Sequence, residues 1–586
     1  MSDLYSGLDD PKIERDLKRS LARAKAFEER YRGGINSAGV TAEFLLQATR
    51  ELESIQETLG KLMSYAHLVF AADTGDPRHG AFLQSIQEKI TGIRNRFIFF
   101  ELEIVAMPAK RAKALLKDEA LAPYRHFIET ERRYKPHVLT EPEEKIMEEK
   151  SNTGSRAFSR LFDEVINSIE FKVRDRGETK RMTEPEVLTL LYDPERSVRR
   201  AAAKGLTRGL DEQTRVLTFI FNTLVQDHAI TDRLRSYATP MDSRNLSNEI
   251  DSRTVRVLMD STEKNFDMVR TYYTLKRKLL GYRKFYDYDR YAPIFKDTKA
   301  FDYGTAREIV LSSFGEFSPR MSGVAAGFFD KGWIDAELRP GKRGGAFSHS
   351  TVPSVHPYVF INYTGRMRDV MTLAHELGHG VHQYLSRGRG YFQCHTPLTT
   401  AETASVFAEM LVFHKLKEME TNPRRRLALL SGKLEDIFAT VFRQVVLTRF
   451  EESLHRARRE DGELTRERIS ELWIEVNKPM FGDSVELSRD YALWWMYIPH
   501  FIHSPFYCYA YAFGELLVMA LYNKFLREGK PFVSRYMGLL SAGGSDAPEA
   551  LLKGVGVDIS DPGFWQTGLD LLRGMVDEAV ELAHSL

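Results

Sequence analysis

The stretch TLAHELGHGVHQYL, Thr372–Leu385, contains the pattern His-Glu-x-x-His and carries the strongest signal in the chain. Apolar residues around the pattern predict a helix, in which positions one turn apart lie above each other on the same face. His375 and His379 occupy such positions, so their imidazoles can bind one zinc ion at about 2.0–2.1 Å. Glu376 is rotated by about 100° from His375, which directs it toward a water on the ion. The stretch predicts a zinc site with Glu376 as general base.

A catalytic zinc site needs a third protein ligand and one open position. His382 is a candidate on the same helix, but we interpret it as an interior histidine. The metzincin pattern fails, because it requires glycine at position 382 and histidine at position 385, where this chain has Leu385. Cys394 and His395 form a neighbouring pair, but the sequence lacks a partner pair at zinc-finger spacing. None of these residues is therefore the preferred third ligand.

Glu402 is the preferred third ligand, because it follows the first helix after a loop. Thr399 or Thr400 can cap a second helix, TTAETASVFAEMLVFHKL, with Glu402 in its first turn. Two helices joined by a turn can return this carboxylate to the metal. The alternative is an ordinary acidic residue that the helix dipole favours. Glu409 lies on the same face and is predicted to hydrogen-bond a ligand histidine, with a buried salt bridge as the alternative.

The rest of the sequence predicts a mainly α-helical fold with a small β element before residue 370. Long amphipathic helices fill the N-terminal part, and Ser168–Thr183 predicts a β-hairpin. The apolar run PYVFINY, Pro357–Tyr363, predicts a strand; as an edge strand it could pair with an extended peptide, and the alternative is pairing wholly within the protein. We expect an N-terminal helical domain over 1–197 and a catalytic domain over 198–586.

A tyrosine-rich segment near the C-terminus offers hydrogen-bond donors for an oxyanion. Ser504 and Pro505 predict a helix start, which would place Tyr507 and Tyr511 on one face of that helix. His500 precedes the start in a turn that could face the same space. The alternative is that these aromatic residues only pack in the interior with their hydroxyls satisfied.

Composition limits the possible classes of function without naming one. The chain has 586 residues and a net charge of +1, which argues against a protein devoted to nucleic-acid phosphates. Two cysteines cannot form a disulfide framework, which fits a reducing compartment. No apolar run is long enough to span a bilayer, and the N-terminus lacks a secretory pattern. We therefore expect a cytoplasmic protein without nucleic-acid or membrane partners.

Several motifs in order resemble the oligoendopeptidase F family of zinc metallopeptidases, which are relatives of thimet oligopeptidase. The resemblance rests on INYTGRMRDVMTLAHELGHGVHQ, on AETASVFAEM, and on two further segments, WIDAELRPGKRGGAFS (Trp333–Ser348) and IPHFIHSPFYCYAYAFGE (Ile498–Glu515). It extends from about residue 200 to residue 580 and is compatible with the helical N-terminal part. The chain departs from the usual pattern at Cys394, His395, His503 and Ser504. These departures concern substrate preference and leave the chemistry of the metal site intact.

The resemblance implies a large helical, zincin-type peptidase that encloses a deep channel and cuts short peptides internally. It implies that the zinc ligands are His375, His379 and Glu402. It also implies that Glu376 is the general base. It also supports three substrate or transition-state contacts, which are His500, Tyr507 and Tyr511.

The leading hypothesis is a zinc endopeptidase for short oligopeptides. Two alternatives come from other classes. One is a zinc hydrolase of a non-peptide amide, which the same metal centre would serve. The other is a non-enzymatic helical scaffold that binds peptides, against which the complete set of His375, Glu376, His379 and Glu402 argues.

Overall fold

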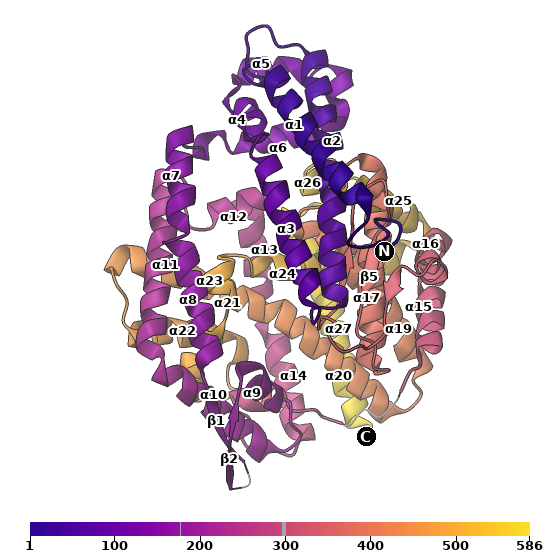
Figure 1. Ribbon diagram of the computed structural model, residues 1–586. Coiled ribbons are helices and arrows are strands. Elements are labelled where there is room, and N and C mark those ends of the chain that lie inside the picture. Colours follow the sequence, from indigo (N-terminus) through magenta and orange to yellow (C-terminus); the bar gives the residue numbers. More distant parts are fainter. Residues whose placement is uncertain (176, 296–299) are drawn as a thin grey trace. The chain divides into compact units, whose positions relative to one another are not determined.

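The computed structural model describes residues 1–175, 177–295 and 300–586 of the chain (Figure 1). Helices dominate and strands are short, which confirms the predicted mainly α-helical fold. The chain forms two compact units, and each is assembled from three separate segments. Unit 1 comprises Met1–Lys135, Lys299–Leu416 and Lys524–Asp558. Unit 2 comprises Pro136–Thr298, Lys417–Asn523 and Ile559–Leu586.

Unit 1 contains the N-terminal helices, a small sheet and the helix with the His-Glu-x-x-His pattern. Its elements are α1 (Pro11–Tyr31), α2 (Ala42–Ala72), α3 (Pro77–Arg94), α4 (Ile98–Ala106), α5 (Ala109–Leu115), α6 (Arg125–Arg133), α15 (Tyr303–Phe317), α16 (Pro319–Asp330), β3 (Ile334–Asp335), β4 (Phe347–His349), β5 (Tyr358–Phe360), α17 (Met367–Ser386), α18 (Leu398–Ala401), α25 (Lys530–Ala542) and α26 (Pro548–Lys553). Two further helices, α19 (Thr403–Met419) and α24 (Tyr509–Glu528), run from one unit into the other.

Unit 2 contains the hairpin and the remaining helices. Its elements are α7 (Glu141–Ser151), α8 (Ser155–Ser168), β1 (Phe171–Asp175), β2 (Glu178–Met182), α9 (Glu184–Leu190), α10 (Arg196–Glu212), α11 (Thr214–Leu234), α12 (Asp242–Ser247), α13 (Ser252–Glu263), α14 (Phe266–Leu279), α20 (Pro423–Thr440), α21 (Phe442–Asp461), α22 (Arg466–Phe481), α23 (His500–His503) and α27 (Pro562–His584).

The predicted hairpin is confirmed, and it packs closely on a helix. Strands β1 and β2 pair antiparallel, with Phe171 opposite Met182. A side chain at Gly209 of α10 would meet the Phe171 ring at 2.5 Å, so the glycine allows the strand to approach the helix backbone. The proposed division into residues 1–197 and 198–586 stays a prediction, and its boundary falls within α10.

The sheet of unit 1 corrects one expectation. The run at Pro357–Tyr363 does form a strand, β5, but the edge position considered for it is wrong, and the alternative of pairing within the protein is confirmed. The strand order is β3-β5-β4, so β5 pairs with a neighbour on both sides. All three residues of β5 are buried, which agrees with the continuous apolar run of a strand covered on both faces. The edge strands are β3 and β4.

Candidate metal centre

Helix α17 carries the two histidines of the pattern and is held firmly at its start. The carboxylate of Asp369 accepts hydrogen bonds from the backbone amides of Thr364 and Arg366, at 2.8 and 3.0 Å. These bonds satisfy amides near the helix N-terminus that lack partners within the helix. Beyond this turn, α17 packs on strands β4 and β5 and on helices α15, α16 and α25. His375 and His379 therefore project from a rigid, largely buried helix.

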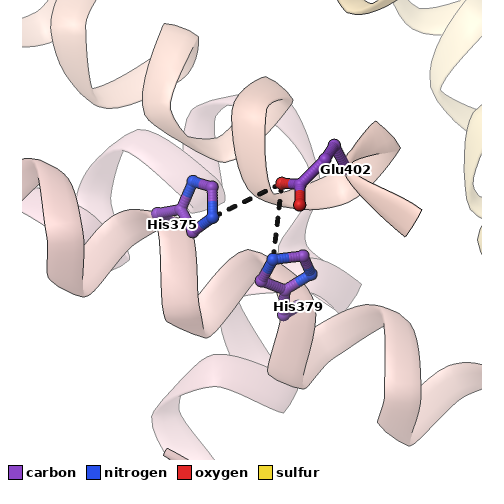
Figure 2. A group of neighbouring side chains, drawn as sticks. All are labelled: His375, His379 and Glu402. Carbon is purple, nitrogen blue, oxygen red and sulfur yellow. Dashed lines mark ion pairs between the residues drawn. The ribbon is translucent and has the colours of Figure 1, made fainter. Parts of the chain in front are cut away.

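Glu402 lies at the junction of two helical segments, where α18 ends and α19 begins. Figure 2 shows its carboxylate facing both imidazoles of α17, with an ion pair to each. The Oε2 atom of Glu402 is 3.4 Å from Nε2 of His375 and 3.5 Å from Nε2 of His379. With His375 and His379, Glu402 forms a group whose possible metal-binding atoms all lie within 4.8 Å of one another. Among the described residues, it is the one such group of three or more histidine, cysteine, aspartate or glutamate side chains. The structure thus brings together the three residues that the sequence singled out as ligands.

The donor set fits a zinc ion in both chemistry and spacing. Two imidazole nitrogens and one carboxylate oxygen are zinc ligands of the catalytic type, which leaves a fourth position open. Two donors that each lie about 2.0–2.1 Å from a tetrahedral ion are separated from one another by about 3.4 Å. The observed separations of 3.4 and 3.5 Å match this value.

The close approach of α17 to α19 depends on a glycine. A Cβ atom at Gly378 would lie 2.6 Å from the carbonyl oxygen of Ala404 and 2.7 Å from Cα of Ser405. Both are backbone atoms, so they cannot move aside as the end of a flexible side chain would. Gly378 therefore allows the contact that brings Glu402 to the histidines.

Replacing Gly378 by alanine is expected to destabilise the protein by about 1–3 kcal/mol, because the added methyl group overpacks a backbone contact. Urea unfolding measures this change, and metal analysis on the same samples reports whether zinc binding falls with it. Gly323→Ala on α16 is the matched control, because a Cβ atom there meets nothing within 4 Å. Equal stability and zinc content in the two variants would show that the contact tolerates a side chain.

Glu409 on α19 fixes the orientation of one imidazole. Nδ1 of His375 donates to Oε1 of Glu409 at 2.5 Å, which leaves Nε2 directed at Glu402. A carboxylate on the outer nitrogen sets the tautomer of a metal-binding histidine and raises its basicity. Without a metal, burial alone would lower the pKa of His375, but Glu409, Glu402 and Glu376 together raise it to about 9.

Two carboxyl groups near the histidines, those of Glu376 and Glu402, have pKa values shifted in opposite directions. Glu376 is 6% exposed, and burial raises its pKa despite the nearby His375 and His379. Burial would also raise the pKa of Glu402, but the hydrogen bond and charge of His379, with further help from His375 and Ser405, lower it to about 2. Glu402 is thus held as an anion, whereas Glu376 has a raised affinity for a proton.

His382 and Ser405 are two further polar residues near the candidate metal position. His382 is buried, burial lowers its pKa to about 4, and it is not part of the metal-binding group. Ser405 was not singled out from the sequence, yet its hydroxyl donates to Oε2 of Glu402 at 2.7 Å. Its position about one helical turn after the expected ligand is the signal that could have identified it.

The three other candidate residues form a cluster of their own in unit 2. Nε2 of His500 and the hydroxyl of Tyr511 lie 3.4 Å apart, and the rings of Tyr507 and Tyr511 are 5.0 Å apart. Burial lowers the pKa of His500, with a smaller contribution from Arg443. The structure therefore brings these three residues together, as the sequence suggested.

The predicted helix start at Ser504 and Pro505 is wrong. Helix α24 begins at Tyr509, and Tyr507 lies in the preceding turn. Phe506 has a φ of +58°, a left-handed value that a right-handed helix cannot contain. The two tyrosines approach each other because of this turn, rather than because of spacing within one helix.

Comparisons with known proteins agree with the geometry. The family model described as Peptidase family M3 matches residues 189–571, and that described as Oligopeptidase F matches residues 103–171.

Full-length relatives extend the likeness over nearly all of the chain. Oligopeptidase PepF of Bacillus subtilis (strain 168) is 29% identical over 552 residues, which cover 92% of this chain and 81% of that protein. A crystal structure from Chlamydophila abortus has a TM-score of 0.88 at 26% identity and covers 99% of this chain and 97% of its own. The structure of oligoendopeptidase-F from Enterococcus faecium has a TM-score of 0.73 at 23% identity and covers 98% of both chains, which shows a shared fold.

Proposed function

Because the chain belongs to peptidase family M3, we propose that it is a zinc-dependent endopeptidase that hydrolyses internal bonds of short oligopeptides. The observation that carries this proposal is the convergence of His375, His379 and Glu402 next to the buried Glu376. The substrate class is supported by the names of relatives such as oligopeptidase PepF of Bacillus subtilis.

His375, His379 and Glu402 would hold the zinc ion. When bound, zinc acts as a Lewis acid that polarises the scissile carbonyl and makes a water molecule more acidic. Glu409 keeps the His375 ring in the tautomer that presents Nε2, and Ser405 hydrogen-bonds the Glu402 carboxylate. These two residues restrict the ligands to one arrangement before any metal arrives.

Glu376 would move the proton. It accepts a proton from the attacking water and delivers it to the nitrogen of the leaving amine, as a general base and then a general acid. Burial raises the pKa of this carboxyl, which brings its proton affinity closer to that needed near neutral pH. Its position one residue after His375 on α17 keeps it near the ligands without occupying a ligand position.

His500, Tyr507 and Tyr511 would contact the substrate or the transition state. Phenol and imidazole groups can donate hydrogen bonds to the oxyanion that forms during peptide hydrolysis. The distances of 3.4 Å between His500 and Tyr511 and 5.0 Å between the tyrosine rings support a shared role.

The cytoplasm is the proposed compartment. Cys394 and Cys508 are both free thiols, which fits a reducing compartment. The net charge of +1 provides no general attraction to polyanions. None of the described helices is both long and apolar enough to cross a membrane.

Mass spectrometry of a defined mixture of short peptides tests the proposed function. We expect internal cleavage products that disappear with a metal chelator and return when zinc is restored. Cleavage that persists after the metal has been removed would contradict zinc dependence. A protein that holds zinc but cuts no peptide would instead point to a hydrolase of a non-peptide amide. A protein that binds peptides but neither holds zinc nor cuts them would point to a peptide-binding scaffold.

A further inference from the structure

The turn before α24 contains a backbone conformation that needs outside support. Phe506 is fully buried and has a φ of +58°. Residues other than glycine rarely adopt this left-handed backbone conformation. Its ring packs against two imidazoles, with its centre 5.9 Å from that of the His228 ring and 4.8 Å from that of the His455 ring. Such a conformation persists only where the surrounding structure enforces it, and such sites cluster at functional positions. The next residue is Tyr507.

Two side chains bind the backbone of this turn directly. The amide of Phe506 donates to Oε1 of Glu451 at 2.7 Å. Nε of Arg244 donates to the carbonyl oxygen of Pro505 at 3.1 Å. Glu451 lies on α21 and Arg244 on α12. Two helices therefore bind successive residues of the turn, one through the amide of Phe506 and the other through the carbonyl of Pro505.

Glu451 is an unusual residue to find at this place. It is 1% exposed, and among the described residues it forms no ion pair, while its Oε2 atom has no hydrogen-bond partner. A buried acid that forms no ion pair costs stability unless it becomes neutral. Burial raises the pKa of Glu451 to about 8, although the hydrogen bond from the Phe506 amide and the charge of Arg244 lower it, so this carboxyl binds a proton more readily than a free glutamate does. The proposed proton transfer does not use this group.

The same turn fixes the surroundings of Tyr507. The guanidinium of Arg244 lies 5.8 Å from the centre of the Tyr507 ring, within the range of a cation–π contact. On the far side of the turn, the hydroxyl of Tyr509 accepts from Asn248 at 2.9 Å, which anchors the start of α24. Tyr507 is thus held between two anchored points, next to Tyr511.

We propose that Glu451 and Arg244 are positioning residues that hold the left-handed turn at Phe506 and thereby place Tyr507 beside Tyr511. The catalytic part of this inference rests on the proposed function, in which Tyr507 contacts the substrate. The positioning part concerns only the turn and can be tested separately.

Kinetics test the catalytic part. Glu451→Ala is expected to lower kcat for a quenched fluorescent peptide roughly 10- to 100-fold with little change in KM, because a small misplacement of a contacting group costs this much. Glu451→Gln should stay close to the unaltered chain, since an amide has the shape of a protonated carboxyl and its oxygen accepts the same bond. Glu452→Gln, which alters the neighbour paired with Arg449, is the matched control. In a Tyr507→Phe background, Glu451→Ala should cause a much smaller loss.

Hydrogen–deuterium exchange of the zinc-loaded full chain tests the positioning part. Amide exchange in the segment 499–511 should rise in Glu451→Ala and remain unchanged in Glu451→Gln and Glu452→Gln. Unchanged exchange in Glu451→Ala would overturn the proposed role of the turn. Equal losses of kcat with and without Tyr507→Phe would overturn its action through Tyr507. If Tyr507→Phe alone has unaltered kinetics, the substrate contact fails, and the exchange result still decides whether Glu451 holds the turn.

Discussion

Replacing Glu376 by glutamine is expected to lower kcat roughly 10²- to 10⁴-fold while the protein keeps its zinc. The amide has the size of the carboxyl but cannot accept a proton from the attacking water. Glu376 is not one of the three side chains whose atoms converge on the candidate metal position, so its replacement removes no ligand. The measurement is turnover of a quenched fluorescent peptide, together with metal analysis of the same preparation.

Glu376→Asp is the matched comparison for this prediction. It keeps a carboxylate but withdraws it by one methylene, so we expect activity between those of the unaltered chain and Glu376→Gln. This order separates a loss of proton transfer from a general disturbance of α17. Near-normal cleavage by zinc-loaded Glu376→Gln would show that another group takes the proton and that the assigned role is wrong.

The parts of the fold that depend on neighbours in sequence could be predicted. The hairpin expected over Ser168–Thr183 is an example, since β1 and β2 lie close together in sequence and pair antiparallel. The convergence of His375 and His379 is another, because helical geometry alone places them on one face. Glu402 could be selected as a candidate because a second helix is expected to begin shortly before it. The expected cap at Thr399 or Thr400 is wrong, since the short helix α18 already begins at Leu398 and Glu402 is its C-cap residue.

The parts that depend on distant segments could not be predicted. Ser504 followed by Pro505 is a common helix start, but the bond from Phe506 to Glu451, a residue 55 positions away, imposes a left-handed turn instead. Strand β5 is apolar enough for either place in a sheet, and only the pairing with β3 and β4 determines that it is central. The division of the chain into two units of three segments each follows from contacts that no local pattern contains.

Replacing Glu402 by alanine is expected to weaken zinc binding on the order of 10³-fold, because the ion loses one of its three protein ligands. Peptide cleavage should fall with metal content, in contrast to Glu376→Gln, which loses turnover and keeps the metal. Titration with a competing chelator measures the affinity. The side chain of Glu402 is 35% exposed, so its replacement is expected to disturb the packing of the protein little.

Glu409→Ala is the informative control, because Glu409 contacts His375 through Nδ1, the nitrogen that faces away from the metal position. Loss of such an outer partner costs roughly 10- to 100-fold in metal affinity. Excess zinc should therefore restore most cleavage in Glu409→Ala and much less in Glu402→Ala, in which an added water would have to replace a carboxylate. Equal affinities in the two variants would mean that Glu402 is not a ligand and that its ion pairs with the two histidines are only structural.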